Sequence, residues 1–454
     1  MKYDYDKLLK FDLNIKNHGK SKYESPLNRV IMSTEDHKMS FVTDEERILV
    51  INSQNEYEEW KKKGIQIPSF EKAGPREKIF FEPGETISAV VTCGGLCPGL
   101  NSVIRALVYM NYYRYNNKIT YGIRYGYEGF IDEYDHEILN LTPGTVENIH
   151  KIGGTVLGSS RGPQSEMSIV DKLVKLKVNV LYVIGGDGTL RGASKLTKEI
   201  ENRNLKISVI GIPKTIDNDI AYIDKSFGSE TAFSKACDAI DAAHIESKGA
   251  PNGIGIVKVM GRHSGFIAAN ATLATNDVNF LLVPEMKFHF DGPKGFLAAL
   301  KKRLDRSSHA VILVAEGAGQ EYFDGAEKKL DPSGNEKLND IGLLLKDKIK
   351  NFLAKEKIPT SIKYIDPSYI IRSTPPTPND SIFCLQLAQK AVHAGMCGKT
   401  NVVIGFFNGE FIHLPIDVAV SERKVLQADS ELWLSVLEST GQPITFINNE
   451  IGTI

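Results

Sequence analysis

Two glycine-rich segments have the composition of phosphate-binding turns. Residues 93–99 read CGGLCPG and residues 185–189 read GGDGT, and each lies between an apolar run and a helix-forming segment. Glycine lets the backbone approach an anion without an intervening Cβ atom, and the free N–H groups that open the following helix point towards that anion. Tight chain reversal alone would explain Gly94 and Gly95 equally well. The pair of turns, with Asp187 in the second, favours a divided phosphate site.

Asp187 is a candidate ligand for a phosphate-bound Mg²⁺ ion. Magnesium takes one or two protein carboxylates and completes its shell with phosphate oxygens and water. Capping of the next helix is the alternative role for this side chain. The sequence has no Walker A motif and no GxGxxG fingerprint with its ribose-binding acid, which disfavours the standard P-loop and dinucleotide sites. Cys93 and Cys97 lack the further His or Cys cluster that a zinc site needs.

Residues 213–219, PKTIDND, combine two carboxylates, a hydroxyl and an ammonium group. Asp217 or Asp219 can accept a proton from a substrate hydroxyl, and Thr215 can hydrogen-bond a transferring phosphoryl group. These are the general-base and electrostatic requirements of phosphoryl transfer. A plain Asx-turn is the alternative, but it does not account for Lys214 and Thr215.

Basic side chains near the ends of predicted strands complete the candidate site. Arginine suits two-pronged contacts with phosphate. Each of these residues alone is more often a surface charge, so the prediction rests on their shared position. The candidates are Arg161 in GSSRG, Arg262 in MGRHS with His263 beside it, and Lys363 and Arg372 at the two ends of KYIDPSYIIR.

Short apolar runs that alternate with helix-like segments predict an α/β fold. Helices are expected over 100–110 and 190–201. In such folds, ligands bind beyond the carboxyl ends of parallel strands. The length of 454 residues favours two doubly wound, Rossmann-like parallel-sheet domains with an active-site cleft between them. The expected strands are 86–92, 178–182, 207–212, 253–259, 279–283, 309–315 and 401–406.

The predicted organisation has three parts. Residues 1–85 form an N-terminal extension. Residues 86–230, with part of 371–430, form a nucleotide-binding α/β domain. Residues 231–370, with the C-terminal segment to 454, form a second α/β domain that binds the phosphoryl acceptor.

Composition narrows the class of protein and its surroundings. The net charge of −1 gives no bulk attraction to nucleic acid or to an acidic membrane. There is no secretory signal and no apolar run of the length that spans a bilayer. Five cysteines, an odd number scattered along the chain, suit a reducing compartment. These features predict a cytoplasmic protein without a nucleic-acid or membrane partner.

The order of the motifs resembles the 6-phosphofructokinase family over residues 86–415. GGDGT also occurs in NAD kinases and diacylglycerol kinases, but membership of those families would not account for PKTIDND and YIIR in the same chain. A catalytically silent regulatory subunit is disfavoured, because Asp187, Thr215, Asp217 and Arg262 are all present. The resemblance rests on GGLCPGLN at 94–101, GGDGT at 185–189, PKTIDND at 213–219, MGR at 260–262, AEG at 315–317 and YIIR at 369–372.

This resemblance implies a glycolytic, allosteric kinase of fructose 6-phosphate and a role for each matching residue. The implied catalytic residues are Asp217 as the base, Thr215 in contact with the moving phosphoryl group, and Arg262, which also contacts the sugar phosphate. Asp187 is implied to hold Mg²⁺. The family is tetrameric or dimeric, which implies a homo-oligomer. The implied ATP-binding residues are Gly94, Tyr127, Arg161, Gly162, Gly186, Asp187, Gly188 and Thr189. The implied sugar-phosphate residues are Thr215, Ile216, Asp217, Met260, Gly261, Arg262, Glu316, Lys363, Tyr369, Ile370, Ile371 and Arg372.

Gly188 and Lys214 bear on the choice of phosphoryl donor. In the pyrophosphate-using members the first position is typically aspartate and the second is lysine. A carboxylate at 188 would repel the α-phosphate of ATP, whereas glycine leaves room for it. Lys214 can hold a phosphate of either donor and so does not discriminate between them. A side chain at 188 that excludes ATP has the larger effect on donor choice. We therefore predict ATP, with a pyrophosphate-dependent enzyme as the alternative. Glycine paired with lysine, together with the N-terminal extension, resembles the long trypanosomatid-type ATP enzymes.

Overall fold

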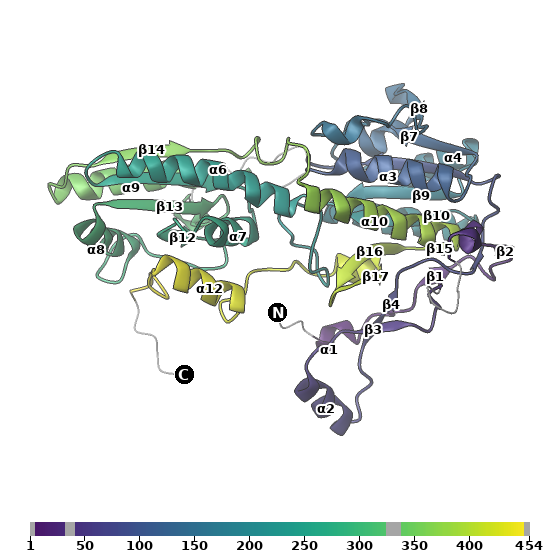
Figure 1. Ribbon diagram of the computed structural model, residues 1–454, viewed down its shortest axis with the longest axis horizontal. Helices are drawn as coiled ribbons and strands as arrows, with labels where there is room; N and C mark the ends of the chain where they lie inside the picture. Colours follow the sequence, from purple (N-terminus) through teal and green to yellow (C-terminus); the bar gives the residue numbers. More distant parts are fainter. Residues whose placement is uncertain (1–4, 32–40, 324–336, 449–454) are drawn as a thin grey trace.

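The computed structural model describes residues 5–31, 41–323 and 337–448. Parts of the predicted extension and of the second domain, and residues 449–454 of the predicted C-terminal segment, lie outside these ranges. The described chain forms two main β-sheets, each covered by helices, which lie side by side (Figure 1). None of the described helices has the length and apolar character needed to cross a membrane.

The first sheet has a parallel centre and antiparallel edges. Its order is β3-β4-β17-β16-β10-β9-β6-β7-β8, and neighbours from β16 to β7 run parallel. The predicted parallel-sheet domain is confirmed by this parallel centre, and both edges of the sheet carry additional strands that pair antiparallel. The bounds are β3 (Arg47–Leu49), β4 (Ser69–Lys72), β17 (Glu410–Pro415), β16 (Val402–Phe407), β10 (Ser208–Pro213), β9 (Val180–Gly185), β6 (Ile87–Thr92), β7 (Ile119–Ile123) and β8 (Ile138–Asn140).

Helices cover both faces of this sheet because its central strands are apolar on both sides. In β9, Tyr182 and Ile184 pack into the core beneath α3 and α10, whereas Leu181 and Val183 pack towards α4 and α5. This two-residue alternation places successive side chains on opposite faces. The helices are α3 (Leu100–Tyr113), α10 (Pro378–Met396), α4 (Glu166–Lys175) and α5 (Asp187–Asn202).

The second sheet is parallel throughout, in the order β12-β13-β11-β14. Helices α6 and α7 pack on one face and α8 and α9 on the other, while α12 packs on α7. The strands are β12 (Phe280–Leu282), β13 (His309–Ala315), β11 (Gly253–Val259) and β14 (Ser361–Ile365). The helices are α6 (Ser229–Lys248), α7 (Phe266–Thr275), α8 (Phe296–Ser307), α9 (Ile341–Lys355) and α12 (Glu431–Thr440).

The described chain crosses between the two sheets three times. It leaves the first sheet after β10, returns after β14 into α10, and leaves again after α11 (Ile416–Ala419) to reach α12. The last crossing is the yellow segment that runs between the two halves in Figure 1. Buried residues of both sheets, including Tyr182 and Val257, belong to one continuous core.

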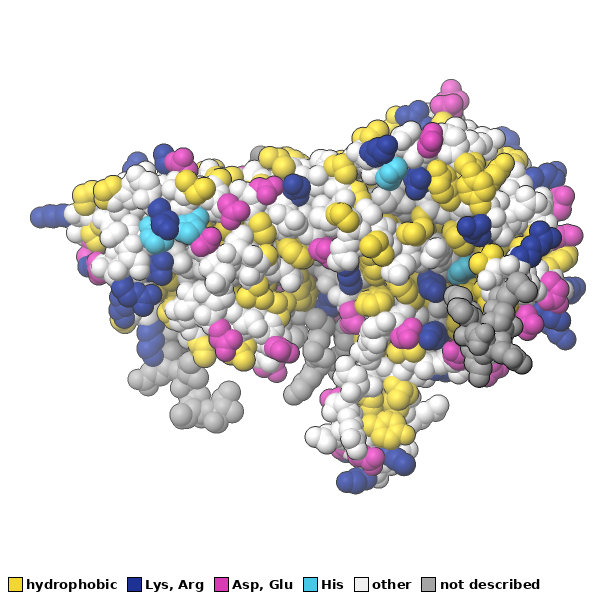
Figure 2. All heavy atoms as spheres, in the orientation of Figure 1, with side chains coloured by type: hydrophobic (Ala, Val, Ile, Leu, Met, Phe, Trp, Pro, Cys, Tyr) yellow, Lys and Arg dark blue, Asp and Glu magenta, His cyan; other side chains and the backbone are white. Residues whose placement is uncertain are grey.

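The N-terminal extension is anchored to the first sheet by β3, β4 and a buried ion cluster. Glu71 Oε1 lies 2.8 Å from Arg76 Nη2, 2.7 Å from Lys399 Nζ and 2.8 Å from His413 Nδ1. Helix α2 projects away from the rest of the molecule (Figure 1). Charges of both signs are mixed over the visible face (Figure 2). The other short elements are α1 (Tyr5–Leu8), β1 (Lys16–Asn17), β2 (Tyr23–Glu24), α2 (Gln54–Lys62), β5 (Lys78–Ile79) and β15 (Lys399–Thr400).

Candidate active site

The turn after β6 is surrounded by cationic side chains. Gly94 has φ +84°, which favours glycine. The buried Lys214 ammonium donates to the Gly95 carbonyl at 2.7 Å. A Cβ atom on Gly95 would lie 3.6 Å from Arg372 Nη1 and 3.7 Å from Arg161 Nη2. Three positive groups from separate segments therefore meet at this turn, an arrangement that suits an anion.

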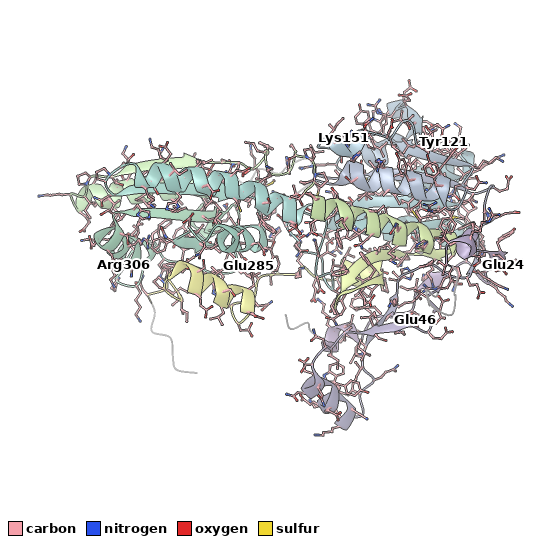
Figure 3. All side chains as sticks on the ribbon, viewed as in Figure 1. Glu24, Glu46, Tyr121, Lys151, Glu285 and Arg306 are labelled. Atoms are coloured by element: carbon pink, nitrogen blue, oxygen red, sulfur yellow. The ribbon has the colours of Figure 1, made fainter. Side chains whose placement is uncertain are left out.

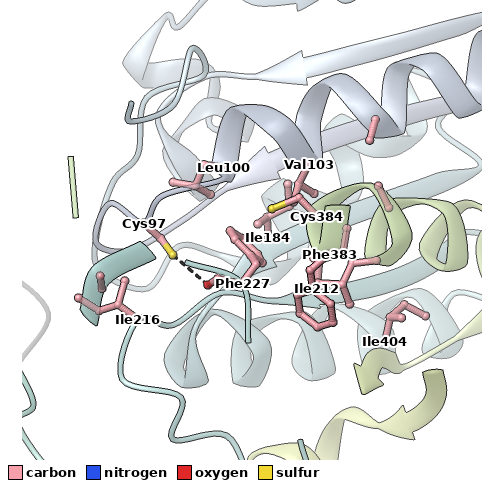
Figure 4. Packing of buried hydrophobic residues seen from close by; sticks show 14 of the residues in the cluster. Cys97, Leu100, Val103, Ile184, Ile212, Ile216, Phe227, Phe383, Cys384 and Ile404 are labelled. Atoms are coloured by element: carbon pink, nitrogen blue, oxygen red, sulfur yellow. Dashed lines mark hydrogen bonds between the residues drawn. The ribbon is translucent and has the colours of Figure 1, made fainter. Parts of the chain in front are cut away.

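The underside of the same turn is packed with apolar and thiol groups. The Cys97 thiol donates to the Phe227 carbonyl at 3.2 Å, and Leu100 and Cys384 lie in the same cluster (Figure 4). Gly228 has φ +85°, and a Cβ atom there would lie 2.2 Å from Cys97 Sγ. This packing fixes the turn against the segment that follows PKTIDND.

The second glycine turn opens directly into α5. The helix begins at Asp187 with Gly186 as its N-cap, so it starts three residues before the predicted 190. The Asp187 carboxylate is paired with Arg191 Nη2 at 3.2 Å and lies 4.0 Å from Arg423 Nη2. The alternative of helix capping by Asp187 is therefore wrong, because the capping position belongs to Gly186.

Tyr127 and Gly162 support the donor side in different ways. The buried Tyr127 hydroxyl donates to the Thr189 carbonyl at 2.9 Å, and a Cβ atom on Gly192 would lie 3.0 Å from its ring. Tyr127 thus braces the first turn of α5 from beneath. Gly162 has φ +104° and no atom within 4 Å of an added Cβ, and Arg161 beside it is exposed.

The PKTIDND loop folds around the Thr215 hydroxyl. Thr215 Oγ1 accepts from the Asp217 N–H at 3.1 Å and donates to Asp219 Oδ1 at 2.9 Å. The Ser264 hydroxyl, which follows β11 of the second sheet, donates to the Asp217 carbonyl at 3.0 Å. This bond joins the loop after β10 to the loop after β11.

The electrostatic setting of Asp217 suits a proton acceptor. Its Oδ1 is buried and has no hydrogen-bond partner among the described residues. Burial, and then the negative charges of Asp219 and Glu316, raise the pKa of Asp217 to about 8, against the opposing pull of Lys214 and Arg262. A carboxylate of this kind is strongly basic for its type.

The loops after β11 and β13 pack backbone against backbone. The Glu316 N–H donates to the Val259 carbonyl at 2.9 Å, and the Gly317 N–H donates to the Gly261 carbonyl at 3.1 Å. Gly261 has φ +133°, and a Cβ atom on Gly317 would lie 2.0 Å from the Arg262 carbonyl. Burial raises the pKa of Glu316, whereas the charge of Arg262 lowers it. The motifs MGR and AEG are therefore brought together.

The YIIR segment divides into exposed and buried residues. Tyr369 is 73% exposed and Ile370 is 68% exposed, and the Arg372 guanidinium lies 4.9 Å above the Tyr369 ring. Arg372 Nε is buried and has no hydrogen-bond partner among the described residues. Ile371 is fully buried in the core, so its side chain is not open to a ligand.

Lys363 is the predicted site residue whose contact points elsewhere. It lies within β14 and is exposed, and its ammonium is 3.8 Å from the Glu246 carboxylate on α6. The sequence placed it among basic residues at strand ends, whereas it lies in the middle of β14, a strand that was not predicted. Its role in phosphate binding stays a prediction.

Comparison with known proteins identifies the family. Residues 88–395 match the phosphofructokinase family model. The ATP-dependent 6-phosphofructokinase of Borreliella burgdorferi is 46% identical over 443 residues, covering 96% of this chain and 98% of that one. The chain belongs to the phosphofructokinase family.

Other phosphofructokinases agree with this assignment. The ATP-dependent 6-phosphofructokinase of Amycolatopsis methanolica is 44% identical, covering 96% of each chain, and that of Trypanosoma brucei brucei is 46% identical, covering 82% of this chain and 76% of the other. The solved pyrophosphate-dependent phosphofructokinase of Nitrosospira multiformis superposes with a TM-score of 0.65 at 17% identity, covering 82% of this chain and 95% of that one. This likeness shows the fold alone.

Sequence motifs did not find several residues that hold the phosphofructokinase loops together. Ser264, Glu285, Arg423 and Lys424 each contact a site loop from a distant part of the chain. Arg423 and Lys424 follow the apolar run 411–420, and this position is the one signal that the sequence offers for them.

Proposed function

We propose that the protein is an ATP-dependent 6-phosphofructokinase. It transfers the γ-phosphoryl group of ATP to the 1-hydroxyl of fructose 6-phosphate and gives fructose 1,6-bisphosphate. The observation that carries this proposal is the unpartnered Asp217 carboxylate beside Asp219 and Glu316, within the influence of Lys214 and Arg262. The names and identities of the relatives support the same reaction.

The donor half of the proposed site belongs to the predicted nucleotide-binding domain, residues 86–230 with part of 371–430. The two glycine turns, Arg161, Gly162 and Thr189 would receive the ATP phosphates. The acceptor half belongs to residues 231–370 with the C-terminal segment. There, Arg262 and the exposed Tyr369 would bind the sugar phosphate with Met260, supported by the loop contacts of Gly261 and Glu316. Arg372, just past the end of this range, would reach the same phosphate from the segment 371–430. The cleft between the halves is part of this proposal.

Asp187 fits the predicted magnesium ion. Its carboxylate is partly exposed, and the described residues hold no group of three or more His, Cys, Asp or Glu side chains placed to ligate a metal. A single carboxylate suits Mg²⁺ that arrives on the phosphates of its nucleotide. When bound, the ion would neutralise charge on the phosphate oxygens.

The proposed mechanism assigns the proton to Asp217. Its carboxylate takes the proton of the sugar 1-hydroxyl as that oxygen bonds to the γ-phosphorus, and the bond from the γ-phosphorus to ADP breaks. Thr215 holds the backbone N–H of Asp217 and orients the loop. Arg262 provides positive charge that stabilises the ionised Asp217 and the sugar phosphate.

The open space at Gly188 supports ATP as the donor. No atom lies within 4 Å of a Cβ atom built on Gly188. An aspartate could therefore be built there without a backbone clash, and its carboxylate would repel the α-phosphate of ATP. Pyrophosphate is the second candidate donor, because Lys214 can hold a phosphate of either.

A coupled assay with fructose 6-phosphate and each donor tests the proposal. We expect turnover with ATP and Mg²⁺ and little with pyrophosphate. Turnover with pyrophosphate alone would overturn the choice of donor. Absence of turnover with both, in protein that retains its thermal melting transition, would overturn the proposed function.

The proposed enzyme is a cytoplasmic, allosterically regulated homo-oligomer, a tetramer or a dimer. The location rests on the composition and cysteine usage of the sequence, whereas the oligomeric state and the regulation rest on family resemblance alone. Sedimentation equilibrium of the full chain measures its mass, and a monomer at all concentrations would contradict the prediction.

A further inference from the structure

The segment 420–426 lies against the loop that carries Asp217. Arg423 forms an antiparallel bridge with Ile220, and the Lys424 N–H donates to the Asp219 carbonyl at 2.8 Å. Lys424 is buried, and its ammonium also donates to backbone carbonyls of the same loop. We call residues 420–426 the crossover segment, because they lead from the first sheet towards α12.

The far end of the crossover segment is tied to the second sheet. The Leu426 N–H donates to Glu285 Oε1 at 2.8 Å, and the same oxygen accepts from the Gly265 N–H at 2.9 Å. Glu285 is labelled in Figure 3 beside α7 and α12. Gly265 follows Ser264, whose hydroxyl bonds the Asp217 carbonyl. One short segment thus connects the base loop with the loop of Arg262.

The crossover segment also reaches Asp187, the proposed magnesium ligand. Asp187 faces Arg191 at 3.2 Å and Arg423 at 4.0 Å, and Arg191 donates to the Val420 carbonyl. Arg423 is 40% exposed and thus lies at the surface of the site. After burial, the positive charge of Arg423 is the next cause that lowers the pKa of His263, which follows Arg262 in the chain.

We propose that Arg423 is a positioning residue for Asp187. Arg191 makes the shorter contacts with the Asp187 carboxylate, at 3.2 and 3.3 Å, and the Arg423 guanidinium at 4.0 Å acts with it to set the direction of the carboxylate that meets the nucleotide-bound cation. The crossover segment ties that direction to the loops of Asp217 and Arg262. The inference rests on the proposed function, since it gives Asp187 its role there. Groups that orient a metal-binding carboxylate typically change metal affinity by about 10- to 100-fold when they are removed. The competing role for Arg423 is direct contact with the ATP phosphates.

Binding measurements on Arg423→Gln separate the two roles. Binding of Mn²⁺·ATP to the full chain is followed by electron paramagnetic resonance, and binding of metal-free ATP in EDTA is followed by calorimetry, both without sugar. We expect Mn²⁺·ATP affinity to fall about tenfold or more, with metal-free ATP affinity unchanged. Arg423→Lys keeps the charge and should recover most of the loss. Glu422→Gln, which breaks the neighbouring pair of Lys7 and Glu422 at 2.6 Å, is the matched control and should change neither affinity.

Two results would overturn the positioning role. Equal losses with and without metal would show that Arg423 binds phosphate directly, and no loss in either measurement would remove it from the site. If Arg423→Gln does not melt cooperatively, the binding measurements are made on Arg423→Met instead, which keeps the aliphatic part of the side chain. A wild-type protein that binds Mn²⁺·ATP but does not phosphorylate fructose 6-phosphate contradicts the proposed function and leaves this comparison intact.

Discussion

At the scale of single residues, the proposed chemistry depends on one carboxylate. Asp217 combines a buried, unpartnered oxygen with two neighbouring negative charges. Replacing it with serine removes the proton acceptor and leaves the loop bond between its N–H and Thr215 available. We expect kcat to fall by about 10²- to 10⁴-fold, with KM for fructose 6-phosphate changing much less. Steady-state kinetics test this, and an unchanged kcat would take the base role away from Asp217.

The raised pKa of Asp217 predicts an alkaline pH profile. Below about pH 8 the free carboxyl holds its proton, so kcat/KM for fructose 6-phosphate should rise with pH through that region. Asp219→Asn removes a neighbouring negative charge and keeps an oxygen for the Thr215 hydroxyl. The rise should therefore move to lower pH in this variant. A profile that does not move would mean that Asp219 does not influence the group that titrates.

Gly188 offers a test of donor choice. Gly188→Asp should strongly depress turnover with ATP while pyrophosphate turnover stays equal or increases, because the new carboxylate faces the α-phosphate position. Gly188→Ala adds a methyl group into the same open space without charge and is the matched control. Equal losses of ATP turnover in the two variants would show that the size of the side chain at 188, and not its charge, limits the use of ATP.

At the scale of elements, the loops after β11 and β13 require glycine where their backbones meet. Gly317→Ala would place a methyl group 2.0 Å from the Arg262 carbonyl, so the two loops would have to separate. We expect a loss of about 1–3 kcal/mol in the free energy of unfolding, measured in urea. Gly188→Ala lies in helix α5 with no neighbour in reach and should stabilise slightly or have no effect. Equal stability of both variants would contradict the close approach.

Elements with strong local patterns were predictable, and those stabilised by distant contacts were not. The predicted strands over 253–259 and 309–315 agree with β11 and β13 at both ends, because both are buried parallel strands with continuous apolar runs. Strand β14 was missed, since its edge position leaves Lys363 exposed in a mixed pattern. Strands β3 and β4 were missed because the local sequence of the extension is polar and their stability depends on distant pairing, of β4 with β17 and of β3 with β4.

In the candidate site, too, local patterns were predictable and contacts between distant segments were not. The sequence placed both glycine turns and PKTIDND correctly after strands, since glycine and acidic residues interrupt apolar runs there. It could not find Arg423 or Glu285, because their contacts join segments far apart in the chain and carry no motif. Burial of Ile371 also escaped prediction, since Ile370 and Ile371 are the same residue type and only the fold makes one exposed and the other buried.

At the scale of the whole molecule, the buried Glu71 cluster should hold the extension in place. Glu71→Gln removes the negative charge that Arg76 and Lys399 share. Breaking a buried ion pair typically costs about 3–5 kcal/mol, so we expect faster proteolysis within the first 80 or so residues and a lower melting temperature. Glu59→Gln, in the exposed pair with Lys63, should change neither. Uniform proteolysis along the variant chain would show that the cluster stabilises the whole molecule and not the extension alone.

The three crossings between the sheets also set the order in which the chain can be assembled during synthesis. The described strands of the second sheet all lie between residues 253 and 365, whereas the first sheet waits for β16 at Val402–Phe407. Since chains emerge N-terminus first, the strands of the second sheet can pair before the first sheet is complete, although α12 at Glu431–Thr440 joins that half last. The donor turns and the base loop, although synthesised by residue 219, acquire their last supports when residues 420–426 leave the ribosome. A chain that stops short of that point holds every predicted catalytic side chain and still lacks the contacts that Arg423, Lys424 and Leu426 make with the loops around them.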